Sequence, residues 1–235
     1  MSTTLKTAIV LAGGLGVRLR PFTEEMPKAM VEVQGKPLLH WIILWLAKND
    51  IERIVIGVAY KKEKIINWVE SHAFGPKIEF SHHEVESGTG GGIRRAVESM
   101  GIEDEVYLVM NGDELCDLPL DSMLRFHLKQ TPIATILSTP LRSNFGVVEI
   151  DSRQRITSFE EKPLIDSIFV NSGVYLFDQQ INSLLPKVGD IEKTTFVSLA
   201  KEKRMAAYRY FGFWRTINTE KDLQDIEDNL DFLIP

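Results

Sequence analysis

The residues best suited to chemistry follow the first apolar run of the chain, in the stretch LAGGLGVRLRPFTEEMPK at positions 11–28. They are the glycines Gly13, Gly14 and Gly16 and the cations Arg18 and Lys28. Glycine has no Cβ, so backbone N–H groups in such a turn can approach a phosphate or a base. The cations place positive charge beside them. We therefore expect a phosphate-binding loop. The alternative is an ordinary tight turn with solvated arginines.

This loop matches neither of two common phosphate-binding fingerprints. It lacks Gly-x-x-x-x-Gly-Lys-Ser/Thr, and Leu19 stands three residues after Gly16, where the dinucleotide-binding pattern has glycine. These departures exclude a P-loop ATPase and a dehydrogenase.

A second glycine-rich segment, SGTGGG at positions 87–92, follows Glu84 and precedes a helix expected to begin near Ile93. The N-terminus of a helix offers free N–H groups and a partial positive charge, which favour an anion or a base. The segment is therefore a candidate ligand contact. A flexible hinge is the alternative.

A carboxylate follows another predicted strand in the sequence Asn111-Gly112-Asp113. Carboxylate oxygens are hard ligands suited to Mg²⁺, so Asp113 is a candidate metal ligand. The alternative is that Asp113 only caps a turn before Glu114.

Short β-branched runs alternate with longer helical patterns over the first 130 residues, which predicts a mostly parallel sheet covered by helices. The predicted strands are 7–12, 53–59, 77–80 and 105–111, and the predicted helices are 37–48, 62–71, 91–100 and 120–130. Such a doubly wound, Rossmann-like α/β sheet binds ligands outside the carboxyl ends of its strands. The glycine loop and Asp113 both leave strands there, so we expect them to face one site.

The second half has closely spaced strands, predicted at 132–139, 146–150, 155–160 and 168–176. We expect them to extend the same sheet as antiparallel additions, which makes the sheet mixed. No Gly/Ser/Pro-rich linker separates the halves, so residues 1–235 are expected to form a single domain.

The last predicted helix opens with Thr219 and Asp222 at the spacing of a capping box. Its apolar stripe consists of Leu223, Ile226, Leu230 and Leu233. The stripe either packs against the sheet or forms a subunit contact in a homo-oligomer.

The composition excludes several classes of protein. A net charge of −6 argues against a nucleic-acid partner, which requires a basic face. The longest apolar run, 38–47, is shorter than the ~20 residues of a membrane span, and no signal peptide is evident. The single cysteine, Cys116, fits a reducing compartment. We expect a cytoplasmic protein without a membrane partner.

The loop at 11–28 closely resembles the signature LAGGxGxRLxPxTxxxPK of the nucleotidyltransferases that make activated sugars, and Leu19, Pro21, Thr23 and Pro27 fill further fixed positions. The resemblance implies the nucleotide-diphospho-sugar transferase fold. It places against the nucleotide Leu11, Ala12, Gly13, Gly14, Gly16, Glu84, Gly88, Thr89, Asn111 and Gly112. It also implies that Arg18 meets the phosphates, Lys28 the reacting phosphate region, and Asp113 a magnesium ion. Ser87 departs from the leucine usual in the family.

Three later motifs have counterparts, in the same order, in this family: FGVV at 145–148, FEEKP at 159–163 and VNSGVY at 170–175. By resemblance they bind the sugar phosphate, through Gly146, Glu161, Lys162 and Asn171. Taken alone, Glu161 and Lys162 would be a solvated pair of little consequence.

The resemblance implies transfer of a nucleotidyl group from a nucleoside triphosphate to a sugar 1-phosphate. A phosphate oxygen of the sugar attacks the α-phosphorus in line and pyrophosphate leaves, with Arg18, Lys28 and Asp113 as catalytic groups. Asn111 and the Gly-Thr-Gly-Gly run favour the guanylyl branches, with GTP and a mannose or heptose 1-phosphate. The alternatives are thymidylyl or uridylyl transfer to glucose 1-phosphate, and a catalytically weak regulatory subunit that binds nucleotide sugars.

One motif departs from the family, which usually carries a second metal-binding aspartate in a Trp-x-Asp motif. Thr216 stands at that position, and a threonine hydroxyl is a weak neutral ligand for Mg²⁺. We expect Asn218 to supply a carbonyl oxygen to an ion held mainly by Asp113. Asp222 is an alternative ligand, but its capping-box spacing already accounts for it. Loss of activity is the third possibility.

Overall fold

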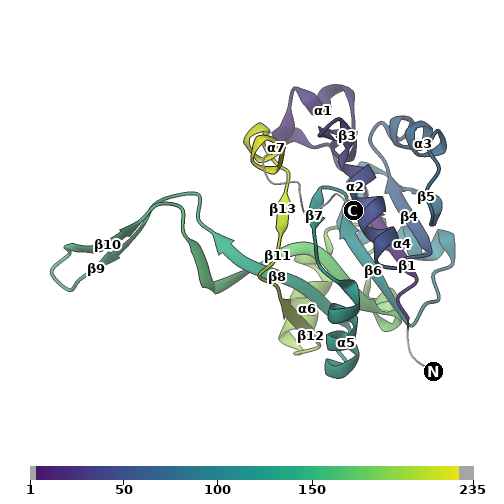
Figure 1. Cartoon of the computed structure of the whole chain (residues 1–235). Helices are drawn as coiled ribbons and strands as arrows, with labels where there is room; N and C mark the ends of the chain where they lie inside the picture. The colour runs from purple at the N-terminus through teal and green to yellow at the C-terminus, as the bar shows by residue number, and fades with distance from the viewer. Residues whose placement is uncertain (1–3, 228–235) are drawn as a thin grey trace.

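The structure, a computed structural model that describes residues 4–227, is built around a seven-stranded mixed sheet of order β12-β8-β11-β6-β1-β4-β5 (Figure 1). The parallel half contains β6 (Val106–Asn111), β1 (Thr7–Leu11), β4 (Arg53–Val58) and β5 (Lys77–His82). The other half contains β11 (Leu164–Asp178), β8 (Ala134–Arg142) and β12 (Met205–Arg209). β11 runs antiparallel to both β6 and β8, and β12 runs parallel to β8. The mixed α/β fold predicted from the sequence is confirmed.

Helices cover both faces of this sheet. The helices that pack on its two faces are α2 (Leu38–Lys48), α3 (Lys62–Glu70), α4 (Gly88–Met100), α5 (Leu120–Gln130) and α6 (Thr195–Lys201). Alternate side chains of a strand point to opposite faces, and in β1 Ala8 and Val10 join one apolar core whereas Ile9 joins the other. The first core packs against α2, α3 and α5, and the second against α4 and α6. The sheet is therefore doubly wound.

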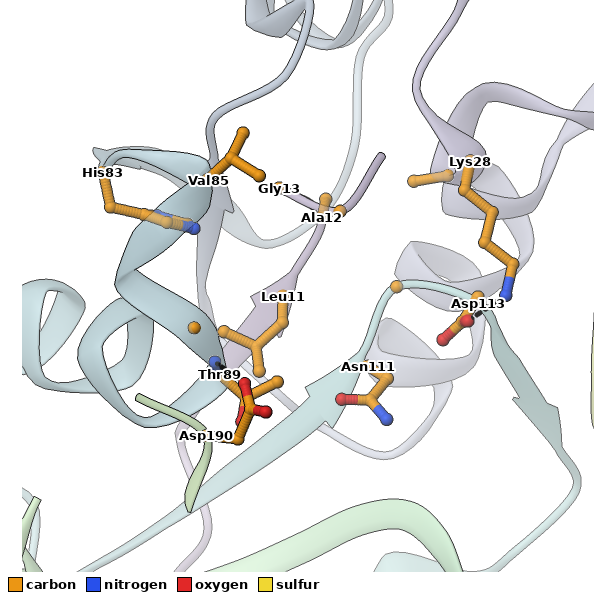
Figure 2. A pocket seen from close by; sticks show the side chains of 14 residues that line it. Leu11, Ala12, Gly13, Lys28, His83, Val85, Thr89, Asn111, Asp113 and Asp190 are labelled. Carbon is orange, nitrogen blue, oxygen red and sulfur yellow. Dashed lines mark hydrogen bonds and ion pairs between the residues drawn. The ribbon is translucent and has the colours of Figure 1, made fainter. Parts of the chain in front are cut away.

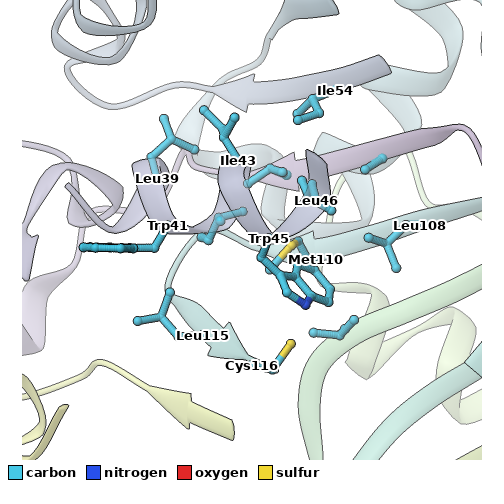
Figure 3. Packing of buried hydrophobic residues seen from close by; sticks show 14 of the residues in the cluster. Leu39, Trp41, Ile43, Trp45, Leu46, Ile54, Leu108, Met110, Leu115 and Cys116 are labelled. Carbon is cyan, nitrogen blue, oxygen red and sulfur yellow. The ribbon is translucent and has the colours of Figure 1, made fainter. Parts of the chain in front are cut away.

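The first core is centred on α2, whose buried residues recur on several sides of the helix (Figure 3). Trp45 lies between the helix and the sheet, close to Met110, and its indole N–H donates to the carbonyl oxygen of Leu118 at 3.1 Å. Cys116 is also buried in this cluster. The tryptophans of α2 and the cysteine thus act as core residues, as their positions in apolar patterns predict.

The topology switches direction between β1 and β6. The chain leaves β1 toward α2 on one face and reaches β6 through α4 on the other. At the carboxyl ends of the two strands, the N–H of Gly112 donates to the carbonyl oxygen of Leu11 at 2.8 Å. Ligands of doubly wound sheets bind at such a switch point. This bond holds the two predicted loops together at that point.

The remaining elements are short. They are η1 (Val17–Leu19), α1 (Phe22–Glu25), η2 (Lys28–Met30), β2 (Glu32–Val33), β3 (Lys36–Pro37), η3 (Val85–Ser87), β7 (Glu114–Cys116), β9 (Val147–Ile150), β10 (Ile156–Glu160), η4 (Gln179–Leu184), η5 (Ile191–Lys193), β13 (Trp214–Thr216) and α7 (Glu220–Glu227). In α7, Leu223 and Ile226 pack against the first core. For these two residues, the prediction that the helix packs against the body of the sheet is confirmed. Leu230 and Leu233 lie outside the described residues.

One expectation about the second half was wrong. β9 and β10 do not join the main sheet but pair with each other in an arm that projects from the body (Figure 1, left). Every residue of both strands is exposed, so neither strand has a buried face. β12 and α6 were not predicted, and β12 adds a parallel rather than an antiparallel strand.

Among residues 4–227, no helix combines the length and the apolar character that a bilayer crossing demands.

Candidate active site

The loop after β1 contains three glycines, of which two are constrained by their surroundings and one is not. Gly16 has φ +61°, a left-handed conformation that favours glycine, and the Thr23 hydroxyl donates to its carbonyl oxygen at 2.7 Å. A Cβ at Gly13 would lie 2.6 Å from Nε2 of His83. Gly14 is exposed, and a Cβ added there would have no neighbouring atom within 4 Å. The packing of the loop therefore requires glycine at positions 13 and 16, whereas nothing in the surroundings requires it at Gly14.

A cavity of about 320 Å³ lies at the switch point between β1 and β6 (Figure 2). Its lining brings together ten of the predicted site residues: Leu11, Ala12, Gly13, Gly14, Lys28, Gly88, Thr89, Asn111, Gly112 and Asp113. His83, Val85, Ala29 and Asp190 complete the lining. A neighbouring hollow shares Gly14, Lys28 and Asp113 with this cavity and adds Gly16, Arg18 and Asn218. Two motifs about a hundred residues apart in sequence thus line one connected site.

Lys28 is held at one side of this cavity by two oxygen atoms. It begins η2, and its ammonium forms an ion pair with Asp113, which lies in the turn between β6 and β7 (Figure 2). The same ammonium donates to Oδ1 of Asn218 at 2.9 Å. Both charged side chains are largely shielded from solvent, which strengthens their attraction. The structure therefore groups the predicted catalytic lysine with both predicted metal-ligating residues.

The segment that carries Asn218 is fixed by the cap of α7. Oδ2 of Asp222 accepts from the backbone N–H groups of Asn218 and Thr219, both at 2.8 Å. The N–H of Asp222 in turn donates to the Thr219 hydroxyl at 3.3 Å. This reciprocal pair is the expected capping box, so the capping role given to Asp222 is confirmed.

Glu114, expected from the sequence only as the residue after a turn, is a buried acid beside Asp113. Its side chain is 6% exposed, and its Oε2 has no hydrogen-bond partner among residues 4–227. Burial, reinforced by the charge of Asp113, raises the pKa of Glu114 well above its ordinary value, although Lys28, Thr216 and Asn111 oppose the shift. The sequence contained one signal for this residue: Glu114 is an acidic residue that directly precedes the apolar residues Leu115 and Cys116.

His83 is a second residue of the site that was not predicted from the sequence. Its ring packs against Gly13, Gly57 and Gly92, and it lines the cavity. Its Nδ1 is buried and has no partner among the described residues. Burial lowers the pKa of His83, so the ring is neutral near pH 7. It forms an uncharged wall of the cavity.

The glycine run at 88–92 lies inside α4, which begins at Gly88 rather than near Ile93 as expected. The N–H groups of Gly90 and Gly91 donate to the carbonyl oxygen of Gly189, at 3.0 and 3.3 Å. A Cβ at Gly90 would lie 2.6 Å from Pro186. These glycines therefore allow the segment 186–190 to pack against the helix, and two of the N–H groups expected to face a ligand are already bonded.

Thr89 and Asp190 close the side of the cavity opposite Lys28 (Figure 2). The Thr89 hydroxyl donates to Glu192 at 2.6 Å and accepts from the N–H of Ile191 at 3.0 Å. A hydrogen bond from Lys193 lowers the pKa of Asp190, which keeps this carboxylate ionised. Glu84 lies outside this cavity, in a separate hollow behind His83.

The predicted sugar-phosphate residues fall into two places. Asn171 lies beside the switch point, because a Cβ at Gly173, two residues on, would come within 2.5 Å of the Asn111 amide. Its own side chain accepts from the N–H of Gly173 and donates to the Tyr175 hydroxyl. Gly146, Glu161 and Lys162 lie at the base of the projecting arm and line neither the cavity nor its neighbouring hollow. The structure does not bring these three to the glycine loop.

A doubly wound sheet with a glycine loop, a lysine and a carboxylate at its switch point defines a phosphate-handling α/β protein. The chain belongs to the nucleotidyl transferase family, which matches residues 7–230. The resemblance seen in the loop at 11–28 is thereby confirmed.

The relatives agree with this membership. The chain is 34% identical over 222 residues to the mannose-1-phosphate guanylyltransferase catalytic subunit beta of Danio rerio, which covers 92% of this chain and 62% of that protein. It is 32% identical over 221 residues to the mannose-1-phosphate guanyltransferase of Yarrowia lipolytica, which covers 91% of this chain and 61% of that protein. The chain thus spans less than two thirds of these relatives.

Among solved structures, HddC from Yersinia pseudotuberculosis complexed with GMP-PN superposes with a TM-score of 0.75 and 25% identity, covering 97% of this chain and 100% of that chain. A UDP-glucose pyrophosphorylase complexed with UDP-glucose has a TM-score of 0.74 and 20% identity, covers 97% of this chain and 98% of that chain, and supports the fold alone.

Proposed function

We propose that this chain transfers a nucleotidyl group from GTP to a sugar 1-phosphate of the mannose or heptose type, with release of pyrophosphate. The observation that carries the proposal is the meeting of Lys28, Asp113 and the glycine loop around one cavity at the switch point. The described residues would act as one catalytic domain. Relatives named as mannose-1-phosphate guanylyltransferases support the choice of acceptor.

The charges around the cavity suggest how the nucleotide would lie. Its phosphates would approach Lys28 and Arg18, the cations at one side. Its base would then lie toward Thr89 and Asp190. An ionised Asp190 is an acceptor, which suits the amino group and ring N–H of guanine better than the carbonyl groups of uracil or thymine. The structure of HddC with GMP-PN supports the same choice of base.

The chain's own residues would act by positioning and by charge stabilisation. Lys28 and Arg18 would stabilise the negative charge that develops on the phosphates as the sugar-phosphate oxygen attacks the α-phosphorus. Asn171, beside Asn111, would orient the acceptor. Lys162 would hold the acceptor's phosphate, which requires the base of the arm to approach the cavity.

A divalent cation fits the oxygen atoms on this side of the cavity, and we propose Mg²⁺. Asp113 and Asn218 both direct oxygen atoms toward a cation, the Lys28 ammonium, and Glu114 keeps a buried oxygen unpartnered. No cluster of three or more His, Cys, Asp or Glu side chains occurs within residues 4–227, which is compatible with Mg²⁺ because its sites often use only one or two carboxylates. When bound, the cation would neutralise phosphate charge and orient the triphosphate.

Incubation of the purified chain with GTP and mannose 1-phosphate tests the proposal directly. We expect a GDP-sugar, identified by mass spectrometry, only when both substrates are present. A regulatory subunit is the rival, because Thr216 replaces an aspartate usual in the family. Tight binding of GDP-mannose without any product from the common nucleoside triphosphates and sugar 1-phosphates would favour that rival.

A further inference from the structure

A carboxylate stands directly across a strand pair from Thr216. β13 pairs antiparallel with β7, and the register places Thr216 opposite Glu114. Side chains of directly opposite residues project from the same face of the pair, with Cβ atoms about 4.5–5.5 Å apart. A carboxylate at either position can therefore face the same space beside the strand pair.

The Glu114 carboxyl group is incompletely satisfied where it lies. The Thr216 hydroxyl and the Asn111 amide hydrogen-bond to it, but Oε2 is buried and has no partner within the described part of the chain. Leaving a buried acceptor unpaired costs about 1–3 kcal/mol. Glu114, which is 6% exposed, lines neither the cavity nor its neighbouring hollow, whereas Asp113 lines both, so a cation that uses this oxygen would lie between the two residues.

Two residues near Glu114 face a cation. Asp113 precedes it in the chain and pairs with the Lys28 ammonium. Asn218 accepts from the same ammonium, and its own amide donates to Oγ1 of Thr216 at 3.0 Å. A continuous set of contacts thus connects the oxygen atoms that face Lys28 with the residue opposite Glu114.

We propose that Glu114 supplies the second protein carboxylate of the divalent-cation site, across the strand pair from Thr216, while Asp113 supplies the first. Asn218 then orients Lys28 and does not carry the role of second ligand. This inference rests on the proposed function, because the cation serves the nucleotide phosphates. The cation site would then contain two protein carboxylates, where the sequence led us to expect one.

The test measures binding of Mn²⁺ alone, from the paramagnetic resonance signal of the free ion, so that no turnover is needed. We expect Glu114→Gln to weaken Mn²⁺ binding by about tenfold or more, since even indirect partners of metal ligands contribute 10–100-fold to affinity. Asp113→Asn should weaken it comparably. Glu160→Gln, at an exposed carboxylate of the arm, is the matched control and should bind as the unmodified protein does.

A double variant moves the carboxylate across the strand pair. Glu114→Gln with Thr216→Asp should regain Mn²⁺ affinity to within about threefold of the unmodified protein, because a carboxylate at either position can face the same space. Thermal unfolding of each variant shows whether it is folded. Thr216→Asp alone is measured beside the double variant. If Glu114 already supplies the second carboxylate, Thr216→Asp should raise Mn²⁺ affinity much less in the otherwise unmodified chain than in Glu114→Gln, whereas a purely structural role of Glu114 predicts equal gains.

Four outcomes would overturn the inference: no Mn²⁺ binding by the unmodified protein, unchanged binding by folded Glu114→Gln, no regain in the double variant, or an equal gain from Thr216→Asp with and without Glu114→Gln. Failure of the proposed function is distinguishable. A protein whose Mn²⁺ binding depends on Glu114 but which forms no nucleotide sugar contradicts the reaction and leaves the cation site standing.

Discussion

The Lys28 ammonium lies 2.9 Å from the side-chain oxygen Oδ1 of Asn218, 190 positions away in the chain. This contact joins the end of the glycine loop to the segment before α7. The C-terminal part of the described chain therefore helps to set the position of the lysine on which the proposed reaction most depends.

Replacing Lys28 with alanine should lower the turnover number by about 10²-fold or more, because it removes a preorganised positive charge from the reacting phosphates. Steady-state kinetics at saturating substrates measures the change. Lys64→Ala, at an exposed lysine of α3, is the control and should leave turnover unchanged. Full turnover by a folded Lys28→Ala protein would refute the role given to this lysine.

Alanine at Gly16 should destabilise the chain, because this residue has φ +61° and an added Cβ would lie 2.8 Å from Cγ2 of Thr23. Forcing an L-residue into the left-handed region costs about 1–2 kcal/mol in the free energy of unfolding. Urea denaturation gives the value. Gly14→Ala is the matched control, since nothing lies within 4 Å of its Cβ position, and it should change the free energy of unfolding by less than about 0.5 kcal/mol. Equal effects of the two substitutions would contradict the account of the loop.

Removal of Lys162 should affect the acceptor and not the nucleotide. We expect Lys162→Ala to raise the KM for the sugar 1-phosphate by about tenfold or more, the effect of losing a charge-assisted hydrogen bond, with the KM for GTP unchanged. Lys201→Ala, at an exposed lysine of α6, is the control. An unchanged KM for the acceptor would mean that the arm's base does not reach the bound sugar phosphate.

Buried histidines should make the fold sensitive to acid. Burial lowers the pKa of His127, whose ring nitrogen Nδ1 bonds to the hydroxyl of Thr135 at 2.8 Å. The unfolded chain protonates its histidines near pH 6.5, so below that pH it binds more protons than the native state. The free energy of unfolding therefore falls as the pH drops below about 6.5.

His127→Gln removes this titration, and the difference in urea midpoint between pH 7.5 and pH 5.5 should shrink. It should not vanish, because burial also lowers the pKa of His40 and His83. An identical difference in the variant would show that His127 does not contribute.

The parallel half of the sheet could be predicted closely because three of its strands, β1, β4 and β6, are buried on both faces. β1, β4 and β6 read as continuous apolar runs, and the helices between them carry one apolar side. The glycine loop and Asp113 follow from these strands, so their meeting at the switch point was also predictable.

The second half of the chain was harder to predict from the sequence. Some of its strands join the main sheet and others pair only with each other, and this depends on contacts between distant residues. The β-branched residues of β9 and β10 predict strands equally well whether a hairpin covers a core or projects alone, so the sequence could not distinguish the two. The early start of α4 was missed because glycine is a poor helix former. At Gly90 the close approach of Pro186 overrides that tendency, and only the fold reveals this neighbour.

Release of pyrophosphate from a panel of nucleoside triphosphates and sugar 1-phosphates tests the central claim most directly. The account predicts release only when both substrates are present, with GTP preferred over UTP and dTTP by more than tenfold and with a mannose or heptose 1-phosphate as acceptor. In the same panel, Asp190→Asn should reduce the preference for GTP. A tenfold preference for dTTP or UTP would contradict the guanylyl assignment, and no release from any pair would contradict nucleotidyl transfer itself.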